Sequence, residues 1–175
     1  YSDIPDNISE LIYNFKGVKG RLQRIDGDGF YVFIDYAHTE DALRSGLSTL
    51  KPLCKGKLIV VFGCGGDRDR SKRPLMAQVA EQLANFVIVT SDNPRTERPE
   101  SIIEEIVTGF ENPDLETIII EPDRRKAIEL AVKTAGKKDI VLIAGKGHET
   151  YQIIGNQKID FSDKKIVQQL LNSKF

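Results

Sequence analysis

The chain has 175 residues, 40% of them hydrophobic, and a formal net charge of −1. That size fits one domain with its own core, and the charge gives no overall basic field for nucleic acid. The two cysteines, Cys54 and Cys64, lack zinc-site spacing and suit a reducing compartment, while no apolar run reaches the ~18–20 residues of a membrane span. We therefore expect a cytoplasmic protein without a nucleic-acid or membrane partner.

The beginning of the chain is patterned differently from the rest. Residues 8–15 (ISELIYNF) place their apolar side chains on one face of two helical turns. Gly17 and Gly20 then interrupt this pattern. We expect residues 1–19 to be a tail helix and linker from another domain, and residues 20–175 to form the domain proper. The chain is thus interpreted as part of a longer protein.

Strand and helix patterns alternate along residues 20–175. A hairpin is predicted around Asp26-Gly27-Asp28-Gly29, followed by apolar runs at 57–62, 86–90, 117–120 and 139–144. Helical patterns lie at 39–53, 74–84, 99–110, 123–135 and 162–171, and a second hairpin surrounds Gly155-Asn156. This order predicts an α/β, three-layer Rossmann-like domain with about six strands, mostly parallel, and an antiparallel edge strand.

Polar and glycine-rich segments follow four of the predicted strands. They occupy residues 35–39, 63–70, 92–95 and 145–149. The carboxyl ends of parallel strands share one edge of a sheet, and ligands of such sheets collect there. The opposite connections are short, lysine-bearing turns. A binding site is therefore predicted at the carboxyl edge.

The segment Asp92-Asn93-Pro94-Arg95 is the most informative of these. It combines an acid, an amide and a guanidinium, and its proline restricts the backbone between the last two. A ligand with both a carboxylate and an ammonium group would suit it. Glu149, just after two glycines, is a candidate partner for an ammonium group, or alternatively a surface acid before a strand.

The glycines at 63–66 raise a dinucleotide-binding hypothesis, because G-x-G follows a strand. The third glycine position of G-x-G-x-x-G is Arg68, which argues against a pyrophosphate site. The glycines could instead turn the backbone and present Arg68 to the crevice. Alternatively, residues 67–70 form a solvated, charge-paired surface.

The segment Gly145-Lys146-Gly147 is similar to the end of a phosphate loop, yet the chain contains no G-x-x-x-x-G-K-[ST]. No nucleoside triphosphate is therefore expected to be cradled in that way. The two histidines have plain structural interpretations. His148 could simply order its loop, and His38 could order the start of the helix that Thr39 caps.

Taken together, these segments resemble one family from Gly20 to the end of the chain. The C-terminal domain of the Mur ligases, in particular the MurE type that adds meso-diaminopimelate, is similar in six places. Glu40 departs from the proline common at that position. The matching segments, in order, are Gly20-Arg21, residues 35–43, residues 63–69, residues 72–76, residues 92–96 and residues 144–149.

The resemblance implies an ATP-dependent, ADP-forming ligase of peptidoglycan precursor synthesis that works through an acyl phosphate. It also implies that ATP and Mg are bound mainly by a central domain, that UDP-MurNAc-dipeptide binds to other domains, and that the protein is a monomer. Catalytic residues and metal ligands are expected outside this chain. Implied meso-diaminopimelate-binding residues are Arg68, Asp92, Asn93, Pro94, Arg95, Gly145 and Glu149. Implied nucleotide-binding residues are Arg21, Asp35 and His38.

Two rival hypotheses remain open at this point. One is a nicotinamide or flavin enzyme that uses the glycines at 63–66, against which Arg68 argues. The other is a non-catalytic α/β interaction domain. Such a domain would have no need for charged loops gathered at one sheet edge.

Overall fold

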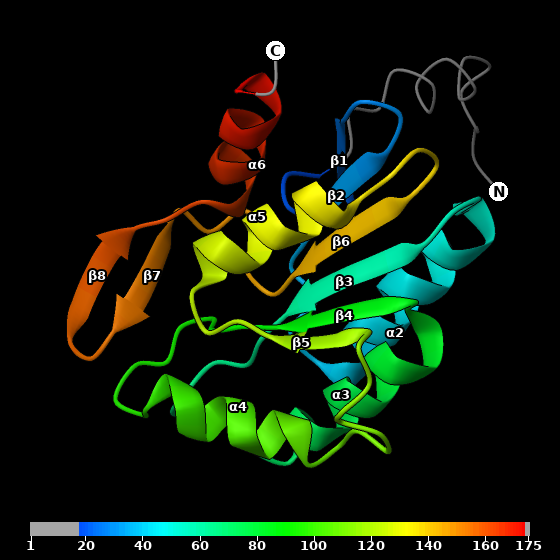
Figure 1. The fold of residues 1–175 in the computed structure, drawn as a ribbon. Helices are drawn as coiled ribbons and strands as arrows, with labels where there is room; N and C mark the ends of the chain where they lie inside the picture. The colour runs from blue at the N-terminus through cyan, green and yellow to red at the C-terminus, as the bar shows by residue number, and fades with distance from the viewer. Residues whose placement is uncertain (1–17, 174–175) are drawn as a thin grey trace, which may run out of the picture.

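The computed structural model describes residues 18–173, so the helix predicted at 8–15 lies outside the described residues. Its central sheet has six strands, of which β1 is an antiparallel edge strand and the other five run parallel. This arrangement confirms the predicted Rossmann-like sheet (Figure 1). In spatial order the strands are β1 (Gln23–Asp26), β2 (Tyr31–Asp35), β6 (Ile140–Ala144), β3 (Leu58–Phe62), β4 (Phe86–Val89) and β5 (Ile118–Ile120).

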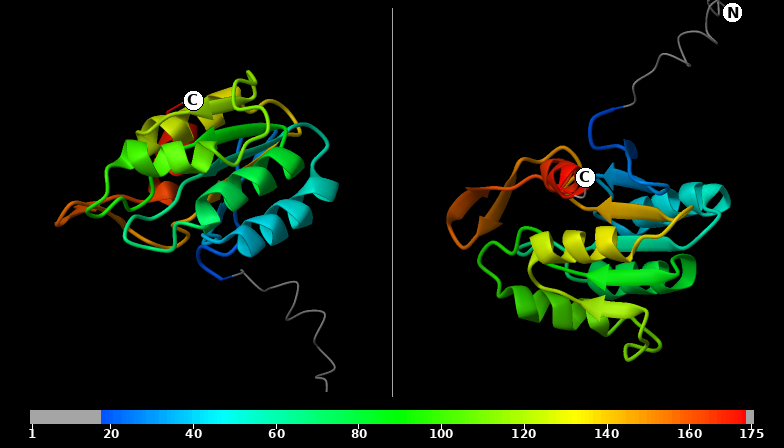
Figure 2. Two further views of the ribbon diagram at one scale, coloured as in Figure 1. Left: turned by 90° about the horizontal axis from the view of Figure 1, so that it is seen from below. Right: turned by 45° about the horizontal axis from the view of Figure 1, so that its top comes forward.

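Five helices cover the two faces of this sheet in the described part of the chain. On one face lie α2 (Glu40–Leu50), α3 (Lys72–Leu83) and α4 (Pro99–Val107), and on the other lie α5 (Arg124–Thr134) and α6 (Asp163–Asn172) (Figure 2). Neighbouring strand residues point to opposite faces, so Val60 joins the first core and Val61 the second. Burial on both faces explains the continuous apolar runs of these strands.

The element boundaries differ from the predicted ones by a few residues. The helix predicted at 39–53 ends as α2 at Leu50, and a 3₁₀ turn, η1 (Lys51–Leu53), follows around Pro52. The helix predicted from Pro74 begins two residues earlier, at Lys72. Proline is accepted there because first-turn N–H groups have no partner within the helix. Thr39 caps α2 as expected, accepting a hydrogen bond from the Ala42 N–H.

The second predicted hairpin forms a separate two-stranded sheet, β7 (Tyr151–Ile154) and β8 (Gln157–Asp160), which projects from the domain in Figure 1. Its backbone pairs with the loop after β4: the Arg95 N–H donates to the Ile153 carbonyl (3.1 Å), and the Gly155 N–H donates to the Arg95 carbonyl (2.7 Å). Gln152 Nε2 also donates to the Asp92 carbonyl (2.7 Å). The hairpin thus braces the loop at residues 92–95.

A buried ion pair fixes the carboxyl ends of two central strands. Arg124 of α5 and Asp163 of α6 are both fully buried, and Arg124 Nη2 lies 2.8 Å from Asp163 Oδ2. The same guanidinium donates to the Ala144 carbonyl at the end of β6 (3.0 Å) and to the Ser91 carbonyl beyond β4 (3.4 Å). The ion pair therefore helps to position the loops that follow β6 and β4.

Within residues 18–173, none of the helices has the length and apolar character required to cross a bilayer.

Candidate functional site

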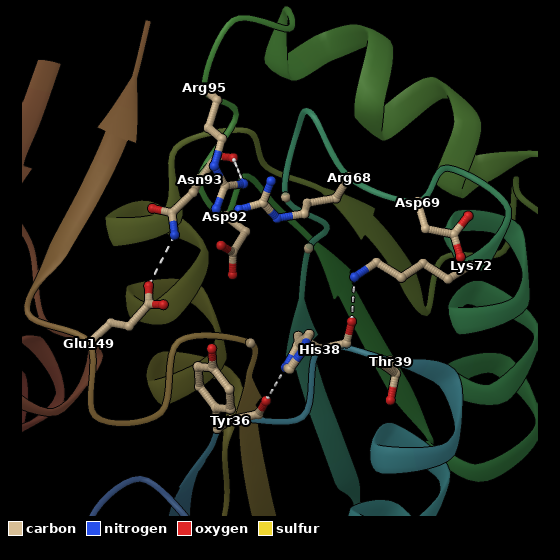
Figure 3. Close-up of a pocket in the computed structure, with 13 residues that line it drawn as sticks. Tyr36, His38, Thr39, Arg68, Asp69, Lys72, Asp92, Asn93, Arg95 and Glu149 are labelled. Carbon is tan, nitrogen blue, oxygen red and sulfur yellow. Dashed lines mark hydrogen bonds between the residues drawn. The ribbon is translucent and has the colours of Figure 1, made fainter. Parts of the chain in front are cut away.

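A cavity of about 320 Å³ opens at the carboxyl ends of β2, β6, β3 and β4, at the predicted edge of the sheet. Figure 3 shows its wall, with side chains from four loops pointing into one space. Strand order explains the grouping, because these four strands are immediate neighbours. The lining residues are Tyr36, His38, Thr39, Gly63, Gly65, Arg68, Asp69, Lys72, Asp92, Asn93, Arg95, Gly145 and Glu149.

The loop after β4 supplies three of these residues in a constrained backbone. Arg95 has a φ of 52°, which a side-chain-bearing residue seldom adopts, and its backbone is held by β7. Its Nη1 donates to the Gly66 carbonyl (2.8 Å) and to the Asn93 carbonyl (3.3 Å). Within the described residues all its side-chain hydrogen bonds come from Nη1, so Nε and Nη2 are available to a ligand. Pro94 is buried and does not line the cavity.

The glycines after β3 allow two loops to touch. A Cβ on Gly63 would lie 2.1 Å from the Thr90 carbonyl oxygen, and one on Gly66 would lie 1.9 Å from that of Pro94. Both oxygens belong to the segment that follows β4. The glycines therefore serve packing between the two loops, which argues against the dinucleotide hypothesis, in which a pyrophosphate takes that space.

Glu149 is held at the cavity by a small polar network. Asn93 Nδ2 donates to Glu149 Oε2 (3.0 Å), while Asn93 Oδ1 accepts from the Ile153 N–H (3.0 Å) and from Lys146 Nζ (2.8 Å). Asn93 is buried, so its amide mainly orients Glu149 and joins the loops after β4 and β6. Asp92 lies beside them, with its Oδ1 3.9 Å from Lys146 Nζ.

Two interpretations of the charged residues at 67–70 were open, namely a site that presents Arg68 to the cavity and a solvated, charge-paired surface. Each describes part of the loop. Arg68 is exposed, lines the cavity and donates to the Asp67 carbonyl (2.9 Å). Asp67 binds the neighbouring loop through Thr96 Oγ1 (2.7 Å), and Arg70 pairs with Glu105 on α4. Arg68 and Asp69 therefore line the cavity, while Asp67 forms a hydrogen bond and Arg70 an ion pair with neighbouring segments.

The three predicted nucleotide-binding residues gather around Tyr36. The Arg21 guanidinium lies 5.0 Å from the centre of the Tyr36 ring, and the His38 ring packs edge-on against it at 4.7 Å. His38 Nδ1 is 2.8 Å from the Tyr36 carbonyl oxygen. The Asp35 carboxylate is buried and accepts hydrogen bonds from the Leu22 and Ala37 N–H groups (2.6 and 2.8 Å). Of these residues, Tyr36 and His38 line the cavity.

Several contributors were not among the predicted site residues. They are Lys146, which lies behind the cavity, and the lining residues Tyr36, Thr39, Gly63, Gly65, Asp69 and Lys72. Lys72, at the start of α3, lines the cavity and donates to the His38 carbonyl (2.7 Å), as Figure 3 shows. Lys146 lies directly behind the cavity and is fully buried. Both lysines stand in segments that carry the family resemblance, but nothing in their spacing distinguishes them from surface lysines.

Both signs of charge face the cavity. Arg68, Arg95 and Lys72 supply cations, and Asp92, Glu149 and Asp69 supply carboxylates. In Figure 3, Asp92 and Glu149 lie on one side, with Arg68 and Arg95 adjoining them. A ligand that carries both ammonium and carboxylate groups would be matched at each charge.

A second ion-pair network ties the site loops to α3 and α4. Arg73 is fully buried and donates to Glu97 Oε1 (2.8 Å), Glu97 Oε2 (2.9 Å) and Glu105 Oε2 (2.9 Å). Glu97 also accepts from the Asp67 N–H (2.7 Å). The hydrogen bond from Arg73, followed by that from Asp67, lowers the pKa of Glu97 to about 2.

This shift predicts an acid-sensitive contribution to folding. A carboxyl whose pKa is lower in the folded state stabilises that state above its unfolded pKa and loses the effect as pH falls through the folded one. Solvent screens this partly exposed carboxylate, so we expect the free energy of unfolding, measured by urea titration, to drop by only about 1 kcal/mol from this group between about pH 4.5 and pH 2. Glu97→Gln should remove this part of the pH dependence, whereas Glu100→Gln, at an exposed pair, should not. If the free energy of unfolding depended on pH in the same way in wild type and Glu97→Gln, the lowered pKa assigned to Glu97 would be contradicted.

Comparisons with known proteins agree on one family. The family model described as "Mur ligase, glutamate ligase domain" matches residues 20–147. A protein of Prochlorococcus marinus subsp. pastoris named UDP-N-acetylmuramoyl-L-alanyl-D-glutamate–2,6-diaminopimelate ligase is 52% identical, over 96% of this chain and 34% of its own length. A protein of the same name from Syntrophomonas wolfei is 47% identical, over 97% of this chain and 35% of its own length.

A solved structure with that ligase name aligns with a TM-score of 0.86 and 45% identity, covering 94% of this chain and 34% of its own chain. The chain thus spans about a third of the length of the relatives it matches.

Proposed function

Because the chain belongs to the Mur ligase family, we propose that it is the amino-acid-binding, C-terminal domain of the ATP-dependent ligase that adds meso-diaminopimelate to UDP-MurNAc-L-Ala-D-Glu. The paired charges of the cavity carry this proposal. Asp92 and Glu149 would take an ammonium group of the amino acid, and Arg68 and Arg95 a carboxylate. Gly145, whose φ of 118° places its backbone against Asp92, would contribute its carbonyl.

Arg95 supports discrimination between meso-diaminopimelate and lysine. Lysine has the distal ammonium group but lacks the carboxylate beside it. The free Nε and Nη2 donors of Arg95 would pair with that carboxylate, whereas with lysine they would face a cation. The repulsion and the missing partner act in the same direction, so lysine is the poorer ligand.

The cluster around Tyr36 suits the nucleotide of the same reaction. Bound ATP would supply the phosphoryl group that activates the carboxylate of the UDP-linked dipeptide, and Mg would be held mainly by other parts of the ligase. Arg21 and His38 are exposed at the rim, where they fit a phosphate or ribose. Asp35 fits less directly, since its carboxylate already accepts two backbone N–H groups; it would position the Arg21 and His38 segments.

In this scheme the residues of the chain bind and orient the incoming amine. Attack of the amine on an acyl phosphate forms the amide bond and expels phosphate. Holding the amino acid at its far end leaves its reacting amine free to point out of the cavity, which lowers the entropic part of the barrier. UDP-MurNAc-dipeptide would bind to other domains of a monomeric ligase in the cytoplasm.

Binding to the chain itself tests this proposal directly. We expect NMR titration to shift backbone signals of residues 65–68, 92–96 and 145–149 with meso-diaminopimelate, at concentrations where L-lysine produces little change. L,L-diaminopimelate, with the same charges, is the matched ligand control for stereochemistry. Binding of lysine as strong as that of meso-diaminopimelate would contradict the proposed selectivity.

Turnover is tested in a fusion. In the Prochlorococcus marinus relative, the segment that aligns with this chain would be replaced by this chain. We expect the fusion to release ADP only when meso-diaminopimelate and the UDP-linked dipeptide are both present. The chain alone, which has no G-x-x-x-x-G-K-[ST] segment, should release none. Substrate-dependent ADP release by the chain alone would contradict this expectation.

A further inference from the structure

Lys146 occupies an unusual position for a lysine. Its side chain is fully buried, and its Nζ lies 2.8 Å from Asn93 Oδ1, 2.9 Å from the Tyr151 carbonyl oxygen and 3.4 Å from Glu149 Oε2. An ammonium group has three N–H donors and no acceptor, so these three acceptors use all of them. The geometry therefore assigns the charged form to Lys146, although burial lowers its pKa.

These contacts join three separate pieces of the cavity wall. Asn93 belongs to the loop after β4, Glu149 to the loop after β6, and Tyr151 to the hairpin that braces Arg95. Gly145 and Gly147, on either side, have positive φ values of 118° and 53°. This sharply turned backbone places Lys146 beneath the cavity, out of reach of solvent, while its neighbours line or border the cavity.

The charged side chains around Lys146 carry a small net negative charge. Asp92, Glu149 and Asp163 are carboxylates, while Lys146 and Arg124 are cations, which leaves one negative charge in the group. Asp92 and Glu149 are the two members that reach the cavity. One ammonium group placed between them would complete the balance. Without the Lys146 charge the group would hold two excess negative charges, and the repulsion between the Asp92 and Glu149 carboxylates would no longer be offset.

We propose that Lys146 is a positioning residue that makes this cavity selective for ligands with a distal ammonium group, by holding the Asp92 and Glu149 carboxylates together at the cavity with Glu149 turned toward the ligand. This inference rests on the proposed function and deepens it. Lys146 does not line the cavity, so it acts through the two carboxylates. It is therefore distinct from Arg95, whose expected partner is the carboxylate of the ligand.

The test compares meso-diaminopimelate with 2-aminopimelate, which lacks only the distal amino group. Dissociation constants would be measured by NMR titration on the whole chain and on Lys146→Gln, which keeps N–H donors for Asn93 and Tyr151 but removes the charge. For the wild type we expect meso-diaminopimelate to bind roughly tenfold more tightly or better. In Lys146→Gln this preference should fall to about twofold or less, because meso-diaminopimelate weakens and 2-aminopimelate does not.

The control is Lys158→Met, which removes an exposed lysine of the same hairpin that stacks on Tyr151, and which should keep the wild-type preference. Equal weakening of both ligands by Lys146→Gln would assign the residue a merely structural role and overturn the inference, and so would an unchanged preference. If Lys146→Gln does not fold, Lys146→Met is measured in its place; failure of both to fold would also overturn it. If the wild-type chain binds no meso-diaminopimelate, the proposed function itself fails.

Discussion

Arg95→Ala is expected to raise the KM for meso-diaminopimelate in the fusion by about ten- to a hundredfold, while the KM for ATP changes by less than about twofold. The range follows from the loss of a charge-assisted pair, which costs roughly 1.5–3 kcal/mol. The contacts of Arg95 with Gly66 and Asn93 are backbone contacts at the cavity wall, and the Tyr36 cluster is built from other loops. Arg95→Ala should therefore weaken the binding of the amino acid and leave that of ATP nearly unchanged.

Two variants sharpen this prediction. Arg95→Lys keeps the charge but loses the planar fork of donors, so an intermediate KM is expected. Arg98→Ala removes an exposed arginine three positions further along, whose only ion pair among the described residues is a loose one with Glu100 (3.8 Å), and should behave as wild type. Equal increases in both KM values for Arg95→Ala would count against its assignment to the amino acid.

Arg124→Met is expected to destabilise the folded chain by about 3–5 kcal/mol, because it leaves the Asp163 carboxylate buried without a partner. It also removes the donor to the Ala144 carbonyl, at the point where β6 enters the site loop. Urea denaturation followed by circular dichroism would measure the change, and the lowered stability should be accompanied by weaker binding of meso-diaminopimelate.

The double variant Arg124→Met, Asp163→Leu separates the ion pair from its surroundings. Replacing both charges by apolar groups should recover much of the stability, since no buried charge is then left unpaired. Lys133→Met, at an exposed pair with Glu129 on the same helix, should cost less than about 1 kcal/mol. A double variant as unstable as Arg124→Met would show that the loss comes from packing or from the Ala144 contact instead.

Patterned features of the fold could be predicted from the sequence. The Val- and Ile-rich strands are buried on both faces, and the Asp26–Gly29 and Gly155-Asn156 turns link antiparallel strands as expected. The carboxyl ends of parallel strands share one edge of a sheet, so grouping Arg68, Asp92 and Glu149 at that edge required no side-chain information. Helix ends were less predictable. Proline is accepted at any position of the first helical turn, so Pro74 did not show that α3 begins two residues before it, at Lys72.

The parts that could not be predicted depend on contacts between distant loops. Nothing local to Lys146 separates a buried lysine from an exposed one; its burial arises only once the hairpin and the loop at 92–95 close over it. Likewise, the acidic and basic residues at 67–70 were equally consistent with a site or with a surface. All four are exposed, and the positions of Glu105 and Thr96 explain why Arg70 and Asp67 contact neighbouring segments and do not line the cavity.

The close approach of Gly63 and Gly66 to the Thr90 and Pro94 carbonyls has a consequence for engineering this domain. At these glycines the main chains of the two loops are in direct contact, and the hairpin at 151–155 is hydrogen-bonded to the loop that follows β4. A point change that resizes the pocket would therefore press on a neighbouring main chain, which cannot yield as a side chain can. Changing the amino acid that the cavity accepts would require exchanging the segments at 63–70, 92–97 and 145–155 together, as one interchangeable cassette.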